Sequence, residues 1–262
     1  MILKVNDDLK KRFWEYVSHE ESINLFIIGD VESYGFDTDF QEVWFQVNEK
    51  DNITSVILKY YSSLIVYSYE NNFNIDELIK HIDNLDISII NGKKSVIDRL
   101  ISKYKKFKSK KECYFCSLKK LEDIDLSRMS HYKIEEASID DLNKVYNFLS
   151  NIEDFDTDNY IESKTHQLKT NSARVYYIKE EKKIINSVST GIETSFLAML
   201  TGVATNKMYR NKGLATYSVY KLSEELLSEG KTPCLFYSNL ESGSIYHKIG
   251  YKQEDNWIML FK

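Results

Sequence analysis

The sequence predicts an α/β protein of two domains. Its 262 residues can form more than one hydrophobic core, and 42% hydrophobic with 29% charged residues is typical of a globular chain. Helical and strand-like hydrophobic patterns alternate throughout, and the alternation starts afresh after the polar segment Glu122–Ser130. We therefore expect an N-terminal α/β domain over residues 1–130 and a second domain over residues 131–262.

The first half alternates amphipathic helices with strands rich in Val, Ile and Tyr. Apolar residues at helical spacing predict helices at Leu9–Ser18, Asp76–Leu85 and Ser95–Tyr104. Short apolar runs predict strands at Ile23–Ile28, Val43–Val47, Ser55–Tyr69 and Ile87–Ile90. The pairs Gly29-Asp30 and Asn91-Gly92 predict turns after the first and last of these strands.

The second half has the same alternation. It predicts strands at Tyr132–Glu136, Arg174–Lys179, Ile184–Thr190, Phe196–Thr205, Cys234–Tyr237 and Trp257–Phe261. Helices are expected at Asp140–Leu149, Asn159–Leu168, Leu214–Ser228 and Ser244–Lys248. Ser138, with Asp141 three residues later, predicts an N-terminal cap for the first of these helices, and Gly230 predicts the end of the third.

Charge and hydropathy exclude several classes of protein. The net charge of −5 argues against a protein that coats nucleic acid. No apolar run approaches the length of a membrane span, and the polar N-terminus lacks the apolar core of a signal peptide. We expect a cytoplasmic protein without a nucleic-acid or membrane partner.

The three cysteines provide no disulfide framework. Cys113 and Cys116 have the spacing of half a zinc site or of a redox motif, but they lie in an apolar run and no second pair supplies more ligands. The five histidines show no H-x-x-x-H spacing and are expected at the surface or as caps. We therefore expect no metal, and we interpret both cysteines as small residues of a strand.

The segment Thr201–Thr216 carries the clearest chemical signal, because it predicts a buried strand, a polar turn and a helix start. The first N–H groups of a helix have no internal partner and carry partial positive charge, so such a turn can hold a phosphate. Gly213 allows close approach of the ligand, Ala215 keeps the first turn slim, and Arg210 adds a charged donor. The motifs G-x-x-x-x-G-K-[ST] and G-x-G-x-x-G are absent, so this turn alone does not identify the ligand.

Arg210-x-x-Gly213-x-Ala215 followed by Asn239-x-x-Ser242-x-x-x-Tyr246-x-x-x-Gly250-Tyr251 resembles the acetyl-CoA-binding core of the GNAT-type N-acetyltransferases. The match is close over residues 196–262, and a weaker strand–helix pattern extends it back to residue 132. The resemblance implies a mixed, mostly antiparallel twisted sheet flanked by helices, with two strands that splay apart. It also implies that CoA, with no metal, contacts Val203, Ala204, Thr205, Arg210, Asn211, Lys212, Gly213, Leu214, Ala215, Thr216, Asn239, Ser242 and Tyr246.

Direct acetyl transfer to an amine needs a proton donor for the departing thiolate and a route for the proton of the amine. The resemblance implies that Tyr246 is this acid; the alternative is a packed aromatic side chain. Glu193, in the polar segment Thr190–Ser195 between two strands, is a candidate base if partial burial raises its pKa. The alternative is a solvated hairpin glutamate, and Thr190 and Ser195 are weaker candidates for lining the same pocket.

The first half lacks an Arg-x-x-Gly-x-Ala turn, so we expect a degenerate GNAT-like domain that supplies substrate walls or a homodimer contact. Gly29-Asp30-x-Glu32 and Phe36–Asp39 are acidic enough to receive a cationic amine, although ordinary turn chemistry is the preferred explanation for both. The acceptor stays open among small molecules, peptide N-termini, lysine, polyamines and aminoglycosides. A non-catalytic acyl-CoA sensor and a transferase of longer acyl groups are the alternative functions.

Overall fold

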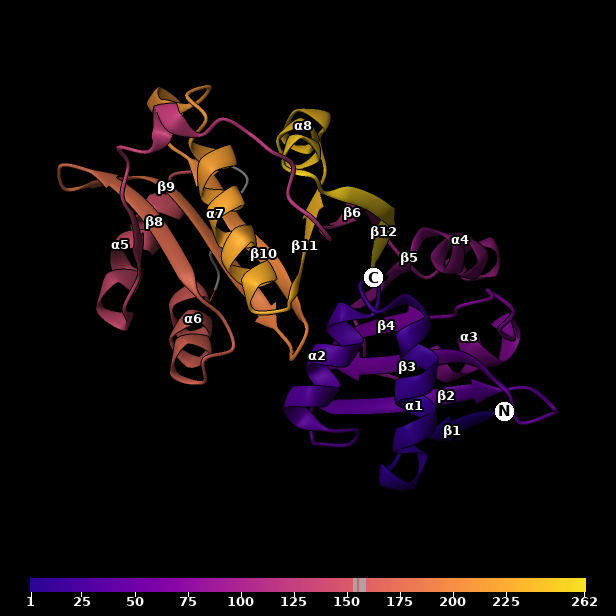
Figure 1. Ribbon diagram of the computed structural model, residues 1–262. Coiled ribbons are helices and arrows are strands. Elements are labelled where there is room, and N and C mark those ends of the chain that lie inside the picture. Colours follow the sequence, from indigo (N-terminus) through magenta and orange to yellow (C-terminus); the bar gives the residue numbers. More distant parts are fainter. Residues whose placement is uncertain (153–154, 156–158) are drawn as a thin grey trace. The chain divides into compact units, whose positions relative to one another are not determined.

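The computed structural model describes residues 1–152, 155 and 159–262 (Figure 1). Contacts divide the chain into two compact units: residues 1–115 with 253–262, and residues 116–252. The first unit therefore contains the end of the chain as well as its beginning. The domain boundary that we expect between residues 130 and 131 stays a prediction.

The first unit is a mixed sheet with helices. Its strands lie in the order β1-β2-β3-β4-β5-β12, and all neighbours are antiparallel except the parallel pair β4–β5. The strands are β1 (Ile2–Lys4), β2 (Gln41–Val47), β3 (Ile53–Tyr60), β4 (Ser63–Tyr67), β5 (Ile89–Lys93) and β12 (Lys252–Phe261). The helices are α1 (Lys10–Val17), α2 (Leu25–Tyr34), α3 (Ile75–Asp83) and α4 (Lys94–Lys103), and strand β6 (Ser109–Ser117) leads into the second unit.

Helices cover both faces of the first sheet. Val66 of β4 belongs to a buried cluster with Leu78 of α3 and Leu100 of α4. The next residue, Tyr67, instead contacts the ring of Tyr16 in α1, with 5.6 Å between ring centroids. Because consecutive strand residues point to opposite faces, α1 lies across the sheet from α3 and α4.

The second unit has the strand order β11-β10-β9-β8-β7, with β10–β11 as its parallel pair. The strands are β7 (Ile134–Glu136), β8 (Val175–Glu180), β9 (Lys183–Glu193), β10 (Leu197–Thr205) and β11 (Thr232–Tyr237). The helices are α5 (Leu142–Leu149), α6 (Tyr160–Lys169), α7 (Leu214–Ser228) and α8 (Leu240–Ile249). The predicted capping box of Ser138 and Asp141 is confirmed at the start of the α5 region.

Helices also cover both faces of the second sheet. Tyr177 of β8 belongs to a cluster with Val145 of α5, whereas the adjacent Ile178 packs with Leu214 of α7. Alternation along the strand therefore puts α5 and α7 on opposite faces. In Figure 1, α7 is the long helix that runs along β9 and β10.

The two halves repeat one order of elements. Leaving out the short 3₁₀ turns, each half runs strand, helix, helix, three strands, helix, strand, helix, strand. The parallel pair falls at the same place in both repeats, as β4–β5 in the first and β10–β11 in the second. The predicted α/β fold with a structural repeat in the first half is confirmed.

One expected strand and two expected turns of the first half are wrong. Ile23–Ile28 and the turn at Gly29-Asp30 lie instead in and around helix α2, whose residues are buried on several sides, so the segment lacks an amphipathic period. Asn91-Gly92 is not a turn but part of β5, where a Cβ at Gly92 would lie 2.6 Å from the carbonyl oxygen of Val66. Gly92 therefore serves close backbone approach rather than chain reversal.

Candidate functional site

Strands β10 and β11 pair along only part of their length. Leu197–Leu200 of β10 pairs with Thr232–Leu235 of β11, and no pairing between them continues over the described residues Thr201–Thr205. The β9–β10 register shifts between Thr201 and Ala204, and Gly202 in this bulge has φ +62°. The expected splay is therefore present, and it leaves one backbone edge of β10 open to a ligand strand or arm.

The turn after β10 is held by local hydrogen bonds. The Asn206 side chain accepts from the N–H of Met208 at 3.0 Å, and Nε of Arg210 donates to the carbonyl of Thr205 at 3.3 Å. Asn211 and Gly213 have left-handed φ values of +60° and +87°. These two left-handed residues form the tight turn that leads into α7.

Helix α7 begins without a side-chain cap and without an acidic residue in its first turn. Its first N–H groups therefore stay available to an external anion, as expected for Leu214, Ala215 and Thr216. A Cβ at Gly213 would lie 3.1 Å from Sδ of Met129, so this position has little space for a side chain. Arg210, Asn211 and Lys212 lie exposed in the same turn.

The corresponding helix of the first unit is closed to an anion. The N-terminus of α3 is capped by Asn74, whose side chain accepts from the N–H of Glu77 at 3.1 Å. Asp76 and Glu77 add negative charge to the first turn of that helix. The two repeats thus share element order, but the first lacks the electrostatics that hold a phosphate.

Tyr246 lies on α8 and is 7% exposed. Its ring is 6.0 Å from that of Tyr237 and 6.1 Å from that of Tyr251. Among the residues that the structure describes, no hydrogen bond engages the Tyr246 hydroxyl. Burial raises the pKa of Tyr246 to about 12, so the phenol stays protonated near neutral pH.

Asn239 and Ser242 form the N-terminal cap of α8. The side-chain oxygen of Asn239 accepts from the N–H of Ser242 at 2.8 Å. Because this bond uses the side-chain oxygen, the NH₂ group of Asn239 is the part of the side chain that can donate to a ligand. Asn239 lies two residues beyond the end of β11, the strand that splays from β10.

Sequence reasoning missed a contact between Tyr237 and His247. The Tyr237 hydroxyl lies 2.9 Å from Nε2 of His247, and Nδ1 of His247 lies 3.0 Å from the carbonyl oxygen of Tyr251. A Cβ at Gly243 would be 2.6 Å from the Tyr237 ring. The signal in the sequence is the i, i+4 spacing of Gly243 and His247, which puts both on the helix face that meets Tyr237.

Glu193 is the last residue of β9 rather than part of a hairpin gap, and its side chain is 3% exposed. Arg174 donates to both carboxylate oxygens at 2.8 Å, and Lys231 donates at 2.6 Å. Burial alone would raise the pKa of Glu193, but hydrogen bonds from Arg174, Lys231 and Thr190 outweigh it and keep this pKa below its usual value. These contacts favour a structural role for Glu193 over that of a base.

Thr190, one of the two weaker candidates for this pocket beside Ser195, belongs to the same ion cluster. Its hydroxyl donates to Glu193 at 2.7 Å, and it accepts from the N–H of Arg174 at 2.8 Å. The carbonyl of Thr190 accepts from the buried Lys164 of α6 at 2.6 Å. Burial lowers the pKa of Lys164 to about 8. Thr190 therefore has its polar groups engaged within the fold.

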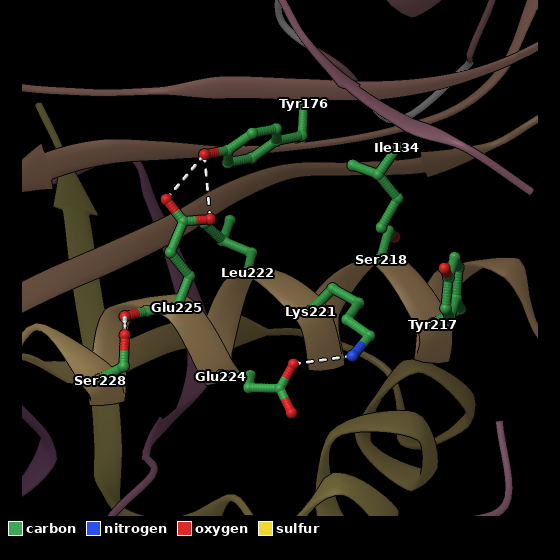
Figure 2. A pocket seen from close by; sticks show the side chains of 9 residues that line it. All are labelled: Ile134, Tyr176, Tyr217, Ser218, Lys221, Leu222, Glu224, Glu225 and Ser228. Carbon is green, nitrogen blue, oxygen red and sulfur yellow. Dashed lines mark hydrogen bonds and ion pairs between the residues drawn. The ribbon is translucent and has the colours of Figure 1, made fainter. Parts of the chain in front are cut away.

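A cavity of about 480 Å³ lies elsewhere, between α7 and strands β7 and β8 (Figure 2). Ile134, Tyr176 and the α7 face from Tyr217 to Ser228 line it. Figure 2 shows the Tyr176 hydroxyl directed at the carboxylate of Glu225, with 2.8 Å to its nearer oxygen. No predicted CoA-binding residue lines this cavity, so it does not coincide with the turn at the start of α7.

All three cysteines are buried, and no disulfide joins them in the part of the chain that the structure describes. Cys113 and Cys116 lie in β6, as expected, and three residues of separation along a strand direct them to opposite faces. Burial raises the pKa of Cys113, which disfavours the thiolate needed for redox or metal chemistry. Within residues 1–152, 155 and 159–262, no group of three His, Cys, Asp or Glu residues has the arrangement of a metal site.

A membrane-spanning helix is not found in the described part of the chain, because none of its helices is both long and apolar enough.

Comparisons with known proteins identify the family and the fold. A family model described as GNAT acetyltransferase matches residues 31–260. An acetyltransferase of the GNAT family from Colwellia psychrerythraea has 10% identity, a TM-score of 0.62 and coverage of 100% of both chains. A GCN5-related N-acetyltransferase-like protein from Streptococcus suis has 14% identity and a TM-score of 0.61, with 97% of this chain and 99% of that chain covered.

A tandem GNAT protein from the clavulanic acid biosynthesis pathway matches 100% of this chain and 98% of its own, with 10% identity and a TM-score of 0.53. At such low sequence identities, the similarity to these structures is a similarity of fold. No curated protein matches the sequence.

Proposed function

Because this chain belongs to the GNAT acetyltransferase family, we propose that it transfers the acetyl group of acetyl-CoA directly to a primary amine. The observation that carries the proposal is the open edge of β10 beyond Leu200, which leads into an uncapped helix N-terminus at Gly213. A long polar arm that ends in a pyrophosphate fits this combination, because the edge offers backbone hydrogen bonds and the helix start offers N–H groups to an anion.

Three sets of residues would hold CoA. Val203, Ala204 and Thr205 offer the backbone edge to the pantetheine arm, and Asn239 with Ser242 offers polar groups from the facing strand end. The pyrophosphate would be held by the N–H groups and side chains of Arg210, Asn211, Lys212, Gly213, Leu214, Ala215 and Thr216. The left-handed φ of Gly213 and the absence of an acidic residue in the first turn support this assignment.

Acetyl-CoA supplies an activated acyl carbon and a thiolate leaving group. The amine nitrogen forms the new bond to this carbon while the carbon–sulfur bond breaks. Tyr246 donates its phenolic proton to the thiolate and regains a proton from solvent, which receives the proton lost by the amine. The unpartnered, protonated hydroxyl of Tyr246 supports this role as the acid.

Glu193 as a general base stays a prediction, and its surroundings argue against it. Arg174 and Lys231 neutralise its carboxylate, and its lowered pKa makes it a weak proton acceptor. The ion cluster instead ties the end of β9 to Glu225 and Glu229 of the α7 end through Arg174.

Two measurements test the proposed function. Isothermal titration of the full chain with acetyl-CoA and CoA should show saturable binding, and absence of binding to both contradicts the proposal. A thiol-release assay over a panel of small amines, polyamines, lysine, peptides and aminoglycosides should show release above background with at least one acceptor. Binding without release over the panel would instead identify a CoA-binding module. Longer acyl-CoA donors in the same assay determine whether acetyl is the preferred group.

A further inference from the structure

Four aromatic rings gather on the surface of the first unit. We call Tyr34, Phe40, Tyr60 and Tyr61 the aromatic cluster. The ring of Phe40 stacks on that of Tyr61, with 5.0 Å between the ring centroids. Phe40 also makes an edge-to-face contact with Tyr34, with 5.2 Å between the centroids. Tyr34 is 37% and Tyr61 60% exposed, so both are among the exposed large apolar side chains of the chain. Grouped exposed aromatic residues are a sign of a binding surface.

The carboxyl group of Asp30 lies beside this cluster without a counter-ion. Asp30 precedes Tyr34 by one turn of α2, so the two share a helix face. Within the described residues its carboxylate forms no ion pair or hydrogen bond, and burial raises its pKa to about 7. The pKa of Tyr60 is also raised, by burial, by a hydrogen bond with Tyr34 and by the nearby charge of Asp30. The carboxyl and the tyrosine hydroxyls therefore share one region.

The neighbouring acidic segment Phe36–Asp39 is different, because the fold already uses it. Asp37 pairs with Lys4 at 2.9 Å. The hydroxyl of Thr38 accepts from the N–H of Gln41 at 2.9 Å, which closes the turn. Turn chemistry therefore explains this segment as expected, whereas it does not explain Asp30, which lies within α2.

We propose that Asp30 and the aromatic cluster bind an organic ammonium ion. The carboxylate supplies the opposite charge, and the ring faces attract a large, weakly hydrated cation. A divalent metal ion is a poor fit, because it needs several oxygen ligands, and within the described residues Asp30 belongs to no group of three His, Cys, Asp or Glu residues that could hold a metal. The ammonium could belong to a primary amine or to a methylated amine, and this site does not depend on the proposed acetyl transfer.

Titration of the full chain, labelled with ¹³C at tyrosine rings, tests the proposal. Choline and butylammonium are the probes, and 3,3-dimethylbutan-1-ol is the neutral analogue of choline. We expect saturable shifts of the Tyr34 and Tyr60 signals, and binding of the neutral analogue at least about tenfold weaker than choline. Tighter binding of butylammonium points to a primary amine as the natural ligand, and tighter binding of choline points to a methylated one.

Two variants and one control complete the test. Asp30→Asn should weaken binding of both cations at least about tenfold, and it should fold because a neutral side chain suits a buried position. Tyr61→Ala, at an exposed site, should weaken binding about threefold. Asp39→Asn removes an exposed carboxylate nearby and should leave binding unchanged. Equal binding of choline and its neutral analogue, or unchanged binding by Asp30→Asn, overturns the proposal.

Discussion

The hydroxyl of Tyr237 and Nε2 of His247 lie 2.9 Å apart and join the last residue of β11 to helix α8. The carbonyl of Tyr251 faces Nδ1 of the same ring at 3.0 Å, so Nδ1 carries the proton and Nε2 accepts from Tyr237. Because Gly243 has no Cβ, the ring of Tyr237 can approach the helix this closely. The contact thereby fixes the helix that carries Tyr246 against the strand that splays from β10.

Replacing Tyr237 with Phe should lower the free energy of unfolding by about 1 kcal/mol, because it removes one hydrogen bond and keeps the ring. Urea unfolding of Tyr237→Phe, His247→Ala and the double variant measures the coupling between the two side chains. If the double variant loses as much free energy of unfolding as the two single variants lose together, the two side chains do not interact.

Replacing Gly213 with Glu should weaken CoA binding at least about tenfold, because the side chain brings bulk and negative charge to the helix start. Gly230 at the other end of α7 is a matched control, since it has a similar φ of +79° and open space around its Cα. Gly230→Glu should have the same backbone strain as Gly213→Glu, and isothermal titration should show that its affinity for CoA is unchanged. Unchanged affinity in Gly213→Glu contradicts our placement of the pyrophosphate.

Replacing Tyr246 with Phe should lower turnover about a hundredfold and leave CoA affinity nearly intact, because it removes a proton donor without removing the ring. The steady-state thiol-release rate and isothermal titration measure the two effects. Tyr251→Phe is the control: its hydroxyl lies 2.8 Å from that of Ser223 in the core, and its loss should not change turnover. Full activity of Tyr246→Phe removes this residue as the acid.

Replacing Glu193 with Gln should destabilise the protein by about 3 kcal/mol at pH 7, because Arg174 and Lys231 lose a buried partner. The folded-state pKa of Glu193 is lowered, so its contribution is complete above the unfolded pKa and disappears as pH falls through the folded value. The free energies of unfolding of the two proteins should therefore begin to converge as pH falls below the unfolded pKa of about 4.3, and they should meet only below the folded pKa.

The same variant separates the two roles of Glu193. Thiol release measured at a temperature where Glu193→Gln is folded should stay within about threefold of the parent, whereas loss of a general base costs at least about a hundredfold. A hundredfold loss with intact CoA binding would restore Glu193 as the base.

Local signals were sufficient where an element obeys a single period. Helix α7 has the expected bounds Leu214–Ser228, because an apolar stripe, a glycine before it and Gly230 after it all agree. The strand predicted at Ile23–Ile28 is wrong, because a helix buried on several sides shows the same continuous apolar run as a buried strand. The surroundings of Glu193 depend on Arg174 and Lys231, whose approach is a property of tertiary structure.

Strand β12 follows the whole second unit in the sequence, yet it pairs with β5 of the first unit and buries Trp257, Ile258 and Leu260. During synthesis this strand therefore leaves the ribosome after both β5 and the second unit. Until then β5 has an unpaired edge, and the apolar face that β12 covers is open to water or to other nascent chains. The first unit is thus begun before the second unit and completed only after it, so its last folding step waits for the synthesis of β12.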